Sequence, residues 1–256
     1  TSLTEAHDTG FSSVFVFEDT GWGGALTFVA ELKNSDWLST NAPSGWSLGP
    51  NQINDMFGWD VSIHENTIFV GTKSSGNAYV YNLVAGKWGT SHTQNWDGGG
   101  TRDYQVENQI ISIVEGKSIK FGQRVEIHGE YAVISATEKN NVGAIYTYKL
   151  TSGVWSLLGN PIFSGITNPD SYSESYFGEA LDFDGTTIVS AAGSLIANRW
   201  SDAYYYGWGS LFELNFPSST CNFTLQTDLC SVNYCATGVF YVSLDLFRSI
   251  FLFATP

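Results

Sequence analysis

The sequence predicts an all-β fold built from repeated units of four short antiparallel strands. Glycine accounts for 27 of the 256 residues and aromatic residues for 15%, whereas charged residues make up only 14%. This composition favours short strands and tight turns. No long stretch has apolar residues at the i, i+3, i+4, i+7 spacing of an amphipathic helix. A short pattern that occurs three times then indicates the order of the strands.

The repeated pattern is a Phe-Gly pair followed by two apolar runs around a short polar turn. The copies read FGWDVSIHENTIFVGT at 57–72, FGQRVEIHGEYAVISA at 121–136 and FGEALDFDGTTIVSAA at 177–192. They align without gaps, and each predicts a hairpin of two strands. The second run has apolar residues on both faces, as expected for a sheet packed between two others. We expect the Phe to lie between neighbouring sheets and the Gly to leave room for the backbone.

A third strand that begins with glycine follows each hairpin, and a fourth strand follows after a turn. The third strands are expected at 76–83, 143–150 and 209–216, and the fourth strands at 86–96, 153–163 and 221–229. Four short antiparallel strands that recur about every 60 residues predict the blades of a β-propeller.

The two ends of the chain are out of phase with these repeats. SSVFVF at 12–17 aligns with the third strand, so that Phe15 and Phe17 take the places of Tyr79 and Tyr81, and ALTFVAEL at 25–32 is expected to be a fourth strand. VSLDLFRSIFLFATP at 242–256 resembles the first two strands, with one additional residue in the turn.

The whole chain, 1–256, is therefore interpreted as one propeller domain or propeller segment. Its expected parts are a half-blade at 12–33, full blades at 57–105, 121–165 and 177–229, and a half-blade at 239–256. Two arrangements remain open. The terminal halves can combine to close a ring of four blades, which would remove exposed strand edges, or the chain can belong to a longer propeller.

The three repeats, over residues 57–229, resemble the FG-GAP repeats of the integrin α-subunit propeller and of related secreted proteins. The resemblance implies a calcium loop of the pattern D-x-D/N-x-D-G-x-x-D between the first and second strands. Calcium needs six to eight oxygen ligands. The turns at 64–67, 128–131 and 184–187 are too short and have too few acids, and the segment DFDG at 182–185 is the nearest remnant. We therefore expect no calcium site and no other cofactor.

Catalytic and metal-binding patterns are not evident elsewhere. His64 and His128 occupy the same position in two repeats, but turns of different blades are expected to lie far apart. The chain has no Gly-x-Ser-x-Gly elbow, phosphate loop or dinucleotide motif. The expectation is a protein that is not an enzyme.

Aromatic residues mark the candidate contact surface. The segment SLIANRWSDAYYYGWGS at 194–210 is expected to be a long loop, and a second connector runs from 36 to 54. Exposed aromatic side chains bind proteins and sugars, although such a loop can also pack over a channel or a neighbouring blade. The candidate contact residues are Trp200, Tyr204, Tyr205, Tyr206 and Trp208 in the first segment, and Trp37 and Trp46 in the second.

Charge and cysteine content point to an extracellular protein. A formal net charge of −14 disfavours binding to nucleic acid, and no apolar run is long enough for a membrane span. The spacing of Cys221, Cys230 and Cys235 fits no common zinc pattern and predicts one disulfide with one additional thiol. Asn222 begins an N-glycosylation sequon. We expect a secreted or cell-surface glycoprotein.

These observations predict a non-catalytic extracellular binding or structural protein that acts in adhesion or in assembly with other protein chains or with copies of itself. The alternative is a lectin-like, glycan-binding propeller that uses the aromatic segment at 194–210. A third, weaker reading is an enzyme on a propeller scaffold.

Overall fold

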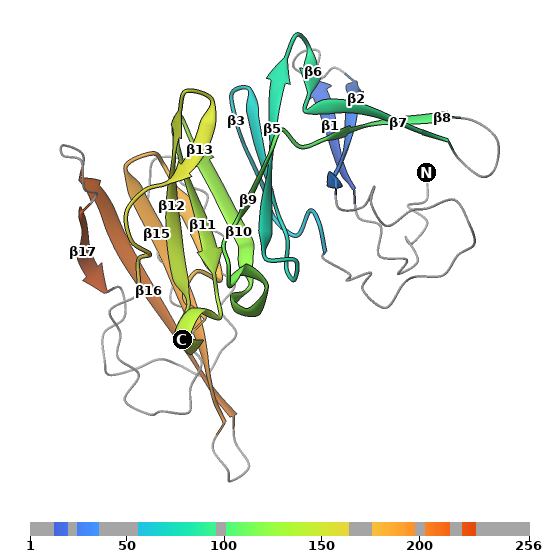
Figure 1. Cartoon of the computed structure of the whole chain (residues 1–256). Helices are drawn as coiled ribbons and strands as arrows, with labels where there is room; N and C mark the ends of the chain where they lie inside the picture. Colours follow the sequence, from blue (N-terminus) through green and yellow to red (C-terminus); the bar gives the residue numbers. More distant parts are fainter. Residues whose placement is uncertain are drawn as a thin grey trace.

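The computed structural model describes seven stretches of the chain, and β-strands dominate all the longer ones (Figure 1). The described residues are 13–19, 25–35, 56–95, 101–163, 176–197, 203–215 and 222–228. Two short 3-10 turns, η1 (Gly116–Ile119) and η2 (Lys139–Asn141), stand between strands of this all-β structure. The predicted all-β class is confirmed.

The strands form four sheets, numbered here from the N-terminus. The first sheet has the order β1 (Val14–Asp19), β2 (Leu26–Lys33), β8 (Thr101–Val106), β7 (Thr90–Asn95). The second has the order β3 (Val61–His64), β4 (Thr67–Gly71), β5 (Asn77–Val84), β6 (Lys87–Trp88), with β9 (Gln109–Ser112) also on β5. The third has the order β10 (Phe121–His128), β11 (Tyr131–Ala136), β12 (Ala144–Thr151), β13 (Val154–Leu157). The fourth has the order β14 (Ala180–Phe183), β15 (Thr187–Ala197), β16 (Ala203–Asn215), β17 (Asn222–Asp228).

The last three sheets repeat the same antiparallel hairpin register. Val61 lies opposite Val70 in the second sheet. The aligned residues pair in the same way, Val125 with Ile134 in the third sheet and Leu181 with Ser190 in the fourth. Residues that align in the three sequences therefore also form equivalent cross-strand pairs in the three sheets.

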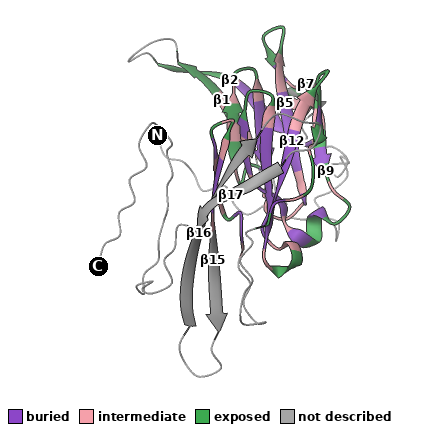
Figure 2. Ribbon diagram, turned by 90° about the vertical axis from the view of Figure 1, so that its left-hand side faces the viewer, coloured by how far each residue is buried: buried purple, intermediate pink, exposed green. Residues whose placement is uncertain are grey.

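The sheets stand side by side in sequence order, so that the middle sheets are buried on both faces (Figures 1 and 2). Ile68 and Val70 of β4 belong to the core between the first and second sheets, whereas Phe69, between them in sequence, belongs to the core between the second and third. In β11, Ile134 faces the second sheet and Val133 faces the fourth. Successive strand residues point to opposite faces, which explains why these runs have no polar alternation. Among the described strands, the sheets form an open row.

The Phe-Gly pairs stand at the junctions between sheets. Phe57, Phe121 and Phe177 are buried in the three successive cores, as the sequence predicted. Phe57 contacts Tyr79 edge to face, with ring centroids 5.4 Å apart, and Phe121 makes the same contact with Tyr146 at 5.4 Å. Such aromatic pairs add to the free energy gained from burial.

The fourth strand of the first repeat differs from the expected 86–96. It is split: β6 pairs with the end of β5, and β9 pairs with its beginning, so that Ala78 lies opposite Ile111. The intervening chain leaves the second sheet as the β7–β8 hairpin and joins the first sheet, where β8 lies parallel to β2. The break occurs at Gly89, whose φ is +63° and where a Cβ would lie 2.2 Å from the carbonyl oxygen of Val106. The apolar Ile111 fills the core position that polar Thr90–Asn95 could not fill.

The segment at 194–210, expected to be a loop, consists mostly of strand. β15 and β16 continue beyond the ends of their neighbours as a two-stranded ribbon (Figure 1). Pairing with β14 ends at Ala191 and pairing with β17 ends at Ser210, whereas β15 and β16 remain paired as far as Ala197 and Ala203. The aromatic and β-branched residues that suggested a binding loop also have high strand propensity, which accounts for the continued pairing.

Replacement of Gly122 by alanine tests the junction between sheets. Gly122 has φ +91°, and a Cβ there would lie 2.2 Å from the carbonyl oxygen of Asn77 in β5. We expect Gly122→Ala to lower the free energy of unfolding by on the order of 4 kcal/mol, because strain at a positive φ adds to a backbone clash. Chemical denaturation measures the loss.

The matched control for this experiment is Gly153→Ala. Gly153 has a similar φ of +80°, but no atom lies within 4 Å of the position of its Cβ. We expect a loss of about 1 kcal/mol from the positive φ alone. Equal losses in the two variants would show that close approach of the sheets at Gly122 does not matter.

Candidate functional site

The first strands of the three repeats, β3, β10 and β14, lie side by side at the inner edges of their sheets. Alternate residues of these strands carry polar side chains, and equivalent positions come together across the sheets. We call this set the polar row. Its members are Asp60, Ser62 and His64 on or next to β3, Arg124, Glu126 and His128 on β10, and Asp182 and Asp184 on or next to β14.

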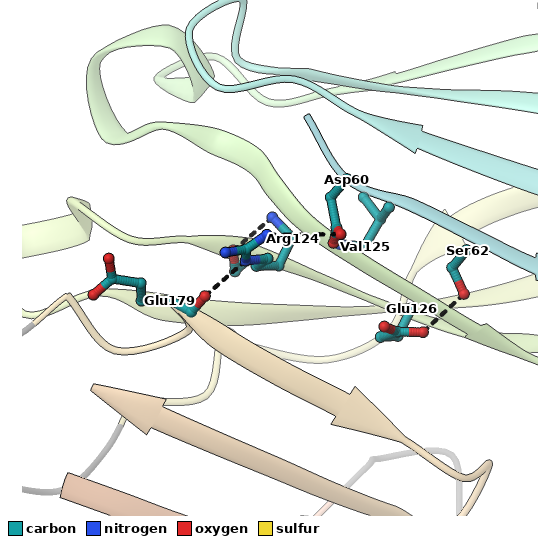
Figure 3. Close-up of polar contacts among 7 residues, drawn as sticks. Asp60, Ser62, Arg124, Val125, Glu126 and Glu179 are labelled. Atoms are coloured by element: carbon teal, nitrogen blue, oxygen red, sulfur yellow. Dashed lines mark hydrogen bonds and ion pairs between the residues drawn. The ribbon is translucent and has the colours of Figure 1, made fainter. Parts of the chain in front are cut away.

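One end of the polar row is held by Asp60 and Arg124 (Figure 3). The backbone N–H of Val125 donates a hydrogen bond to Asp60 Oδ2 at 2.8 Å, and a guanidinium nitrogen of Arg124 lies 3.7 Å from Asp60 Oδ1. Arg124 Nε also donates to the carbonyl oxygen of Glu179 at 2.7 Å. Arg124 therefore links the second, third and fourth sheets. Burial raises the pKa of Asp60 above its usual range, although the Val125 hydrogen bond and the Arg124 charge act against this rise.

The centre of the polar row is Glu126. Ser62 Oγ donates a hydrogen bond to Glu126 Oε2 at 2.8 Å (Figure 3). It also accepts one from the N–H of Ile127 at 3.2 Å. Burial raises the pKa of Glu126 to about 7; the Ser62 hydrogen bond opposes this rise, whereas the nearby carboxylates of Asp60 and Asp182 increase it. Glu126 is therefore a group that gains and loses a proton near neutral pH.

The other end of the polar row brings two histidines together. The rings of His64 and His128 lie with their centroids 4.5 Å apart, so the expectation that these turns are distant is wrong. Adjacent sheets stack in register, and the same turn position in consecutive repeats is therefore a neighbour. Asp184 holds the equivalent position in the fourth sheet, and a Cβ added to the next residue, Gly185, would lie 2.6 Å from His128.

Asp184 is engaged by its own turn. Its Oδ1 accepts hydrogen bonds from the N–H groups of Thr186 and Thr187, at 2.8 and 2.7 Å. Burial acts to raise the pKa of Asp184, but these hydrogen bonds outweigh it and the pKa is lowered. Within the described stretches, no three His, Cys, Asp or Glu side chains are arranged to hold a metal ion. Residues 182–185, compared with a calcium loop in the sequence analysis, thus form a turn that is closed by Asp184.

The outer face of the first sheet carries a second candidate site, which the sequence analysis did not identify. Phe15, Phe17 and Phe28 are 51%, 52% and 56% exposed, and their rings contact one another at centroid distances of 6.4 and 5.8 Å. We call these three residues the Phe patch. Val14 and Val16 point the other way and pack on the core shared with the second sheet. The sequence did contain a signal for this site. Phe15 and Phe17 align with Tyr79 and Tyr81, which are fully buried by a neighbouring sheet.

The candidate aromatic residues divide between β16 and parts of the chain outside the description. Tyr204, Tyr205, Tyr206 and Trp208 lie in β16, opposite Ile196, Leu195, Ser194 and Ala192. Tyr204, Tyr206 and Trp208 occupy alternate positions of this strand, and Tyr205 stands between the first two. Asn222, the sequon residue, is the first residue of β17 and pairs with Asn215. Outside the described residues lie Trp37, Trp46, Trp200, Cys221, Cys230, Cys235 and the half-blade at 239–256.

The proton on Glu126 is expected to make stability depend on pH. Its pKa is raised from 4.5 to about 7, so its contribution is complete below about pH 4.5 and is lost as the pH rises through 7. At pH 8 we expect Glu126→Gln to be more stable than the native protein by about 2 kcal/mol, with little difference at pH 4.5. Urea denaturation between these pH values measures the difference.

The control is Glu65→Gln, in the exposed β3–β4 turn. This variant removes one negative charge without changing a buried carboxyl group, and it should keep the pH dependence of the native protein. If Glu126→Gln also kept that dependence, Glu126 would not be the group that titrates.

Comparisons with known proteins leave the family open. No protein-family model matches this chain, and no curated protein shows significant similarity to its sequence. None of the helices in the described stretches is long and apolar enough to cross a membrane. Arguments about function therefore start from the repeated sheets, the polar row and the Phe patch.

Proposed function

We propose that this chain is an FG-GAP-like β-propeller, or a segment of one, that serves as a non-catalytic scaffold in a secreted or cell-surface protein and binds other protein chains or copies of itself. The repeated hairpin register and the row of first strands support the propeller. The sequon at Asn222 and the cluster of cysteines at 221–235 support the extracellular location.

The Phe-Gly contacts support the assignment to blades of one type. Phe57 lies against Tyr79 and Tyr81 of its own third strand, with centroid distances of 5.4 and 6.4 Å. Phe121 lies against Tyr146 and Tyr148 with distances of 5.4 and 6.3 Å. A contact that recurs with the same geometry at equivalent positions is what a blade repeat would produce.

The Phe patch is the observation that carries the binding proposal. At the equivalent positions in the second sheet, Tyr79 and Tyr81 are buried because another sheet covers them. No described strand covers Phe15, Phe17 and Phe28 on the first sheet. A contiguous apolar surface of this kind marks an interaction site, and full burial of each Phe contributes about 1.5–3 kcal/mol. The patch is therefore suited to contact a sheet of another chain.

Sedimentation velocity over a range of concentrations tests this proposal. The native chain is expected to associate, and Phe15→Ser/Phe17→Ser/Phe28→Ser is expected to sediment as a monomer of 28.0 kDa. Val114→Ser is the control, because Val114 is fully exposed but lies in a turn outside the patch. If the native chain stayed monomeric at every concentration, the proposal that it binds copies of itself would be wrong.

A lectin-like role is the second candidate, and the β15–β16 ribbon favours it. Tyr204, Tyr206 and Trp208 occupy alternate positions of β16. Aromatic rings in a row offer apolar faces on which sugar rings can stack, with polar groups at the ring edges.

Binding of glycans on an array tests this second role. We expect Tyr204→Ala/Tyr206→Ala/Trp208→Ala to lose binding by at least about tenfold, a loss of 1.4 kcal/mol or more. Tyr205→Ala, which changes an intervening position, should retain it. Failure of the native protein to bind any glycan would count against a lectin.

A further inference from the structure

His64 and His128 occupy the ends of two neighbouring inner strands. His64 is the last residue of β3, and His128 is the last residue of β10. Each belongs to the last cross-strand pair before the turn of its hairpin, His64 with Thr67 and His128 with Tyr131. Strand pairing therefore fixes the backbone of both histidines, and the packing of the second sheet on the third brings their side chains together.

The separation of the two rings suits a pair of ligands on one metal ion. The ring centroids lie 4.5 Å apart, and the ring planes are inclined by 38°. A late first-row metal ion binds an imidazole nitrogen at about 2 Å. Two imidazoles at right angles around such an ion, as in tetragonal complexes of Cu²⁺ or Ni²⁺, have centroids about 4.5 Å apart. The observed distance is therefore that of two adjacent ligands.

The surroundings leave imidazole nitrogens available to an ion. Within the described ranges, no hydrogen bond is made to the ring of His64 or His128. The turn of the fourth sheet approaches His128 from its Cδ2 side, since a Cβ on Gly185 would lie 2.6 Å from Cδ2 and 3.3 Å from Nε2. Nδ1 lies on the other side of the ring and faces away from that turn. His128 is exposed and His64 is half-buried, so a hydrated ion can reach both.

Negative charge near the histidines favours a cation. Burial acts to raise the pKa of Asp184, but hydrogen bonds from its own turn lower it, and the charge of His128 adds to this lowering. The carboxylate of Asp184 is therefore close enough to His128 to interact with a positive charge there. The chain as a whole has a formal net charge of −14, which raises the concentration of cations at its surface.

We propose that His64 and His128 form a two-histidine site for a late first-row divalent metal ion, with water in the remaining coordination positions. Imidazole suits Ni²⁺, Cu²⁺ and Zn²⁺, whereas calcium prefers oxygen ligands. The site needs only two protein ligands, which is consistent with the lack of a cluster of three among the described residues. Because one histidine comes from each repeat, a bound ion joins the second sheet to the third. The proposal rests on the packing of these sheets and is independent of the binding role proposed above.

Calorimetric titration of the full chain with Ni²⁺ tests the proposal. We expect the native protein to bind Ni²⁺, and His64→Ala and His128→Ala each to weaken this binding by about tenfold or more, because loss of even an indirect partner in a metal site costs about 10–100-fold. His92→Ala is the matched control. His92 is also a strand histidine, on β7, but its ring lies against Tyr104 instead of a second histidine. This variant should bind Ni²⁺ as the native protein does.

Urea denaturation with and without Ni²⁺ gives a second readout and shows that each variant folds. Only the folded chain holds the two histidines together, so Ni²⁺ should raise the denaturation midpoint of the native protein and of His92→Ala. The midpoints of His64→Ala and His128→Ala should change little. No binding by the native protein, or an equal loss of affinity in His92→Ala, would overturn the proposal. Binding that persists unchanged in both single variants would show an adventitious ion only and would overturn it as well.

Discussion

The packing of the second sheet on the third depends on the close approach of backbone to backbone at the Phe121-Gly122 pair. The carbonyl oxygen of Gly122 accepts a hydrogen bond from the N–H of Thr72 at 2.9 Å, and a Cβ on Gly71 would lie 2.4 Å from that oxygen. Gly58, Gly122 and Gly178 all have φ between +82° and +93°. Each therefore adopts a backbone conformation that residues with a Cβ rarely adopt, and the preceding Phe enters the core. Sheet spacing, core packing and alignment of the polar row all follow from this junction.

The polar row is a consequence of stacking in register. Once the junctions place β3, β10 and β14 side by side, residues that are equivalent in sequence become neighbours in space. Ser62 then meets Glu126, and His64 meets His128. Buried polar groups are tolerated when they find partners, and Asp60, Ser62, Arg124 and Glu126 find them through hydrogen bonds or opposite charges. The side chain of Arg124 contacts both neighbouring sheets, because it reaches Asp60 and the carbonyl group of Glu179.

The sequence was sufficient for the features that repeat and insufficient for those that occur once. The hairpin of β3 and β4 and the burial of Phe57 were both predicted, because three copies of one pattern fix strand order and side-chain alternation. The split fourth strand was missed because local alternation in 86–96 indicates a strand but does not say which sheet it joins. The histidine contact was missed because it depends on how one sheet is placed against the next. Exposure of the Phe patch likewise depends on what covers the first sheet.

The parallel pairing of β2 with β8 gives the first sheet a different folding problem from the others. The second, third and fourth sheets contain antiparallel hairpins of chain neighbours, whereas Lys33 pairs with Val106 across the whole of the first repeat. Ser35 and Glu107, which are 72 positions apart, add a hydrogen bond from backbone to side chain at 2.9 Å. Contacts at such a separation carry a large loop-closure entropy and form slowly. We therefore expect the first sheet to form after the second, to which the β7–β8 hairpin connects it.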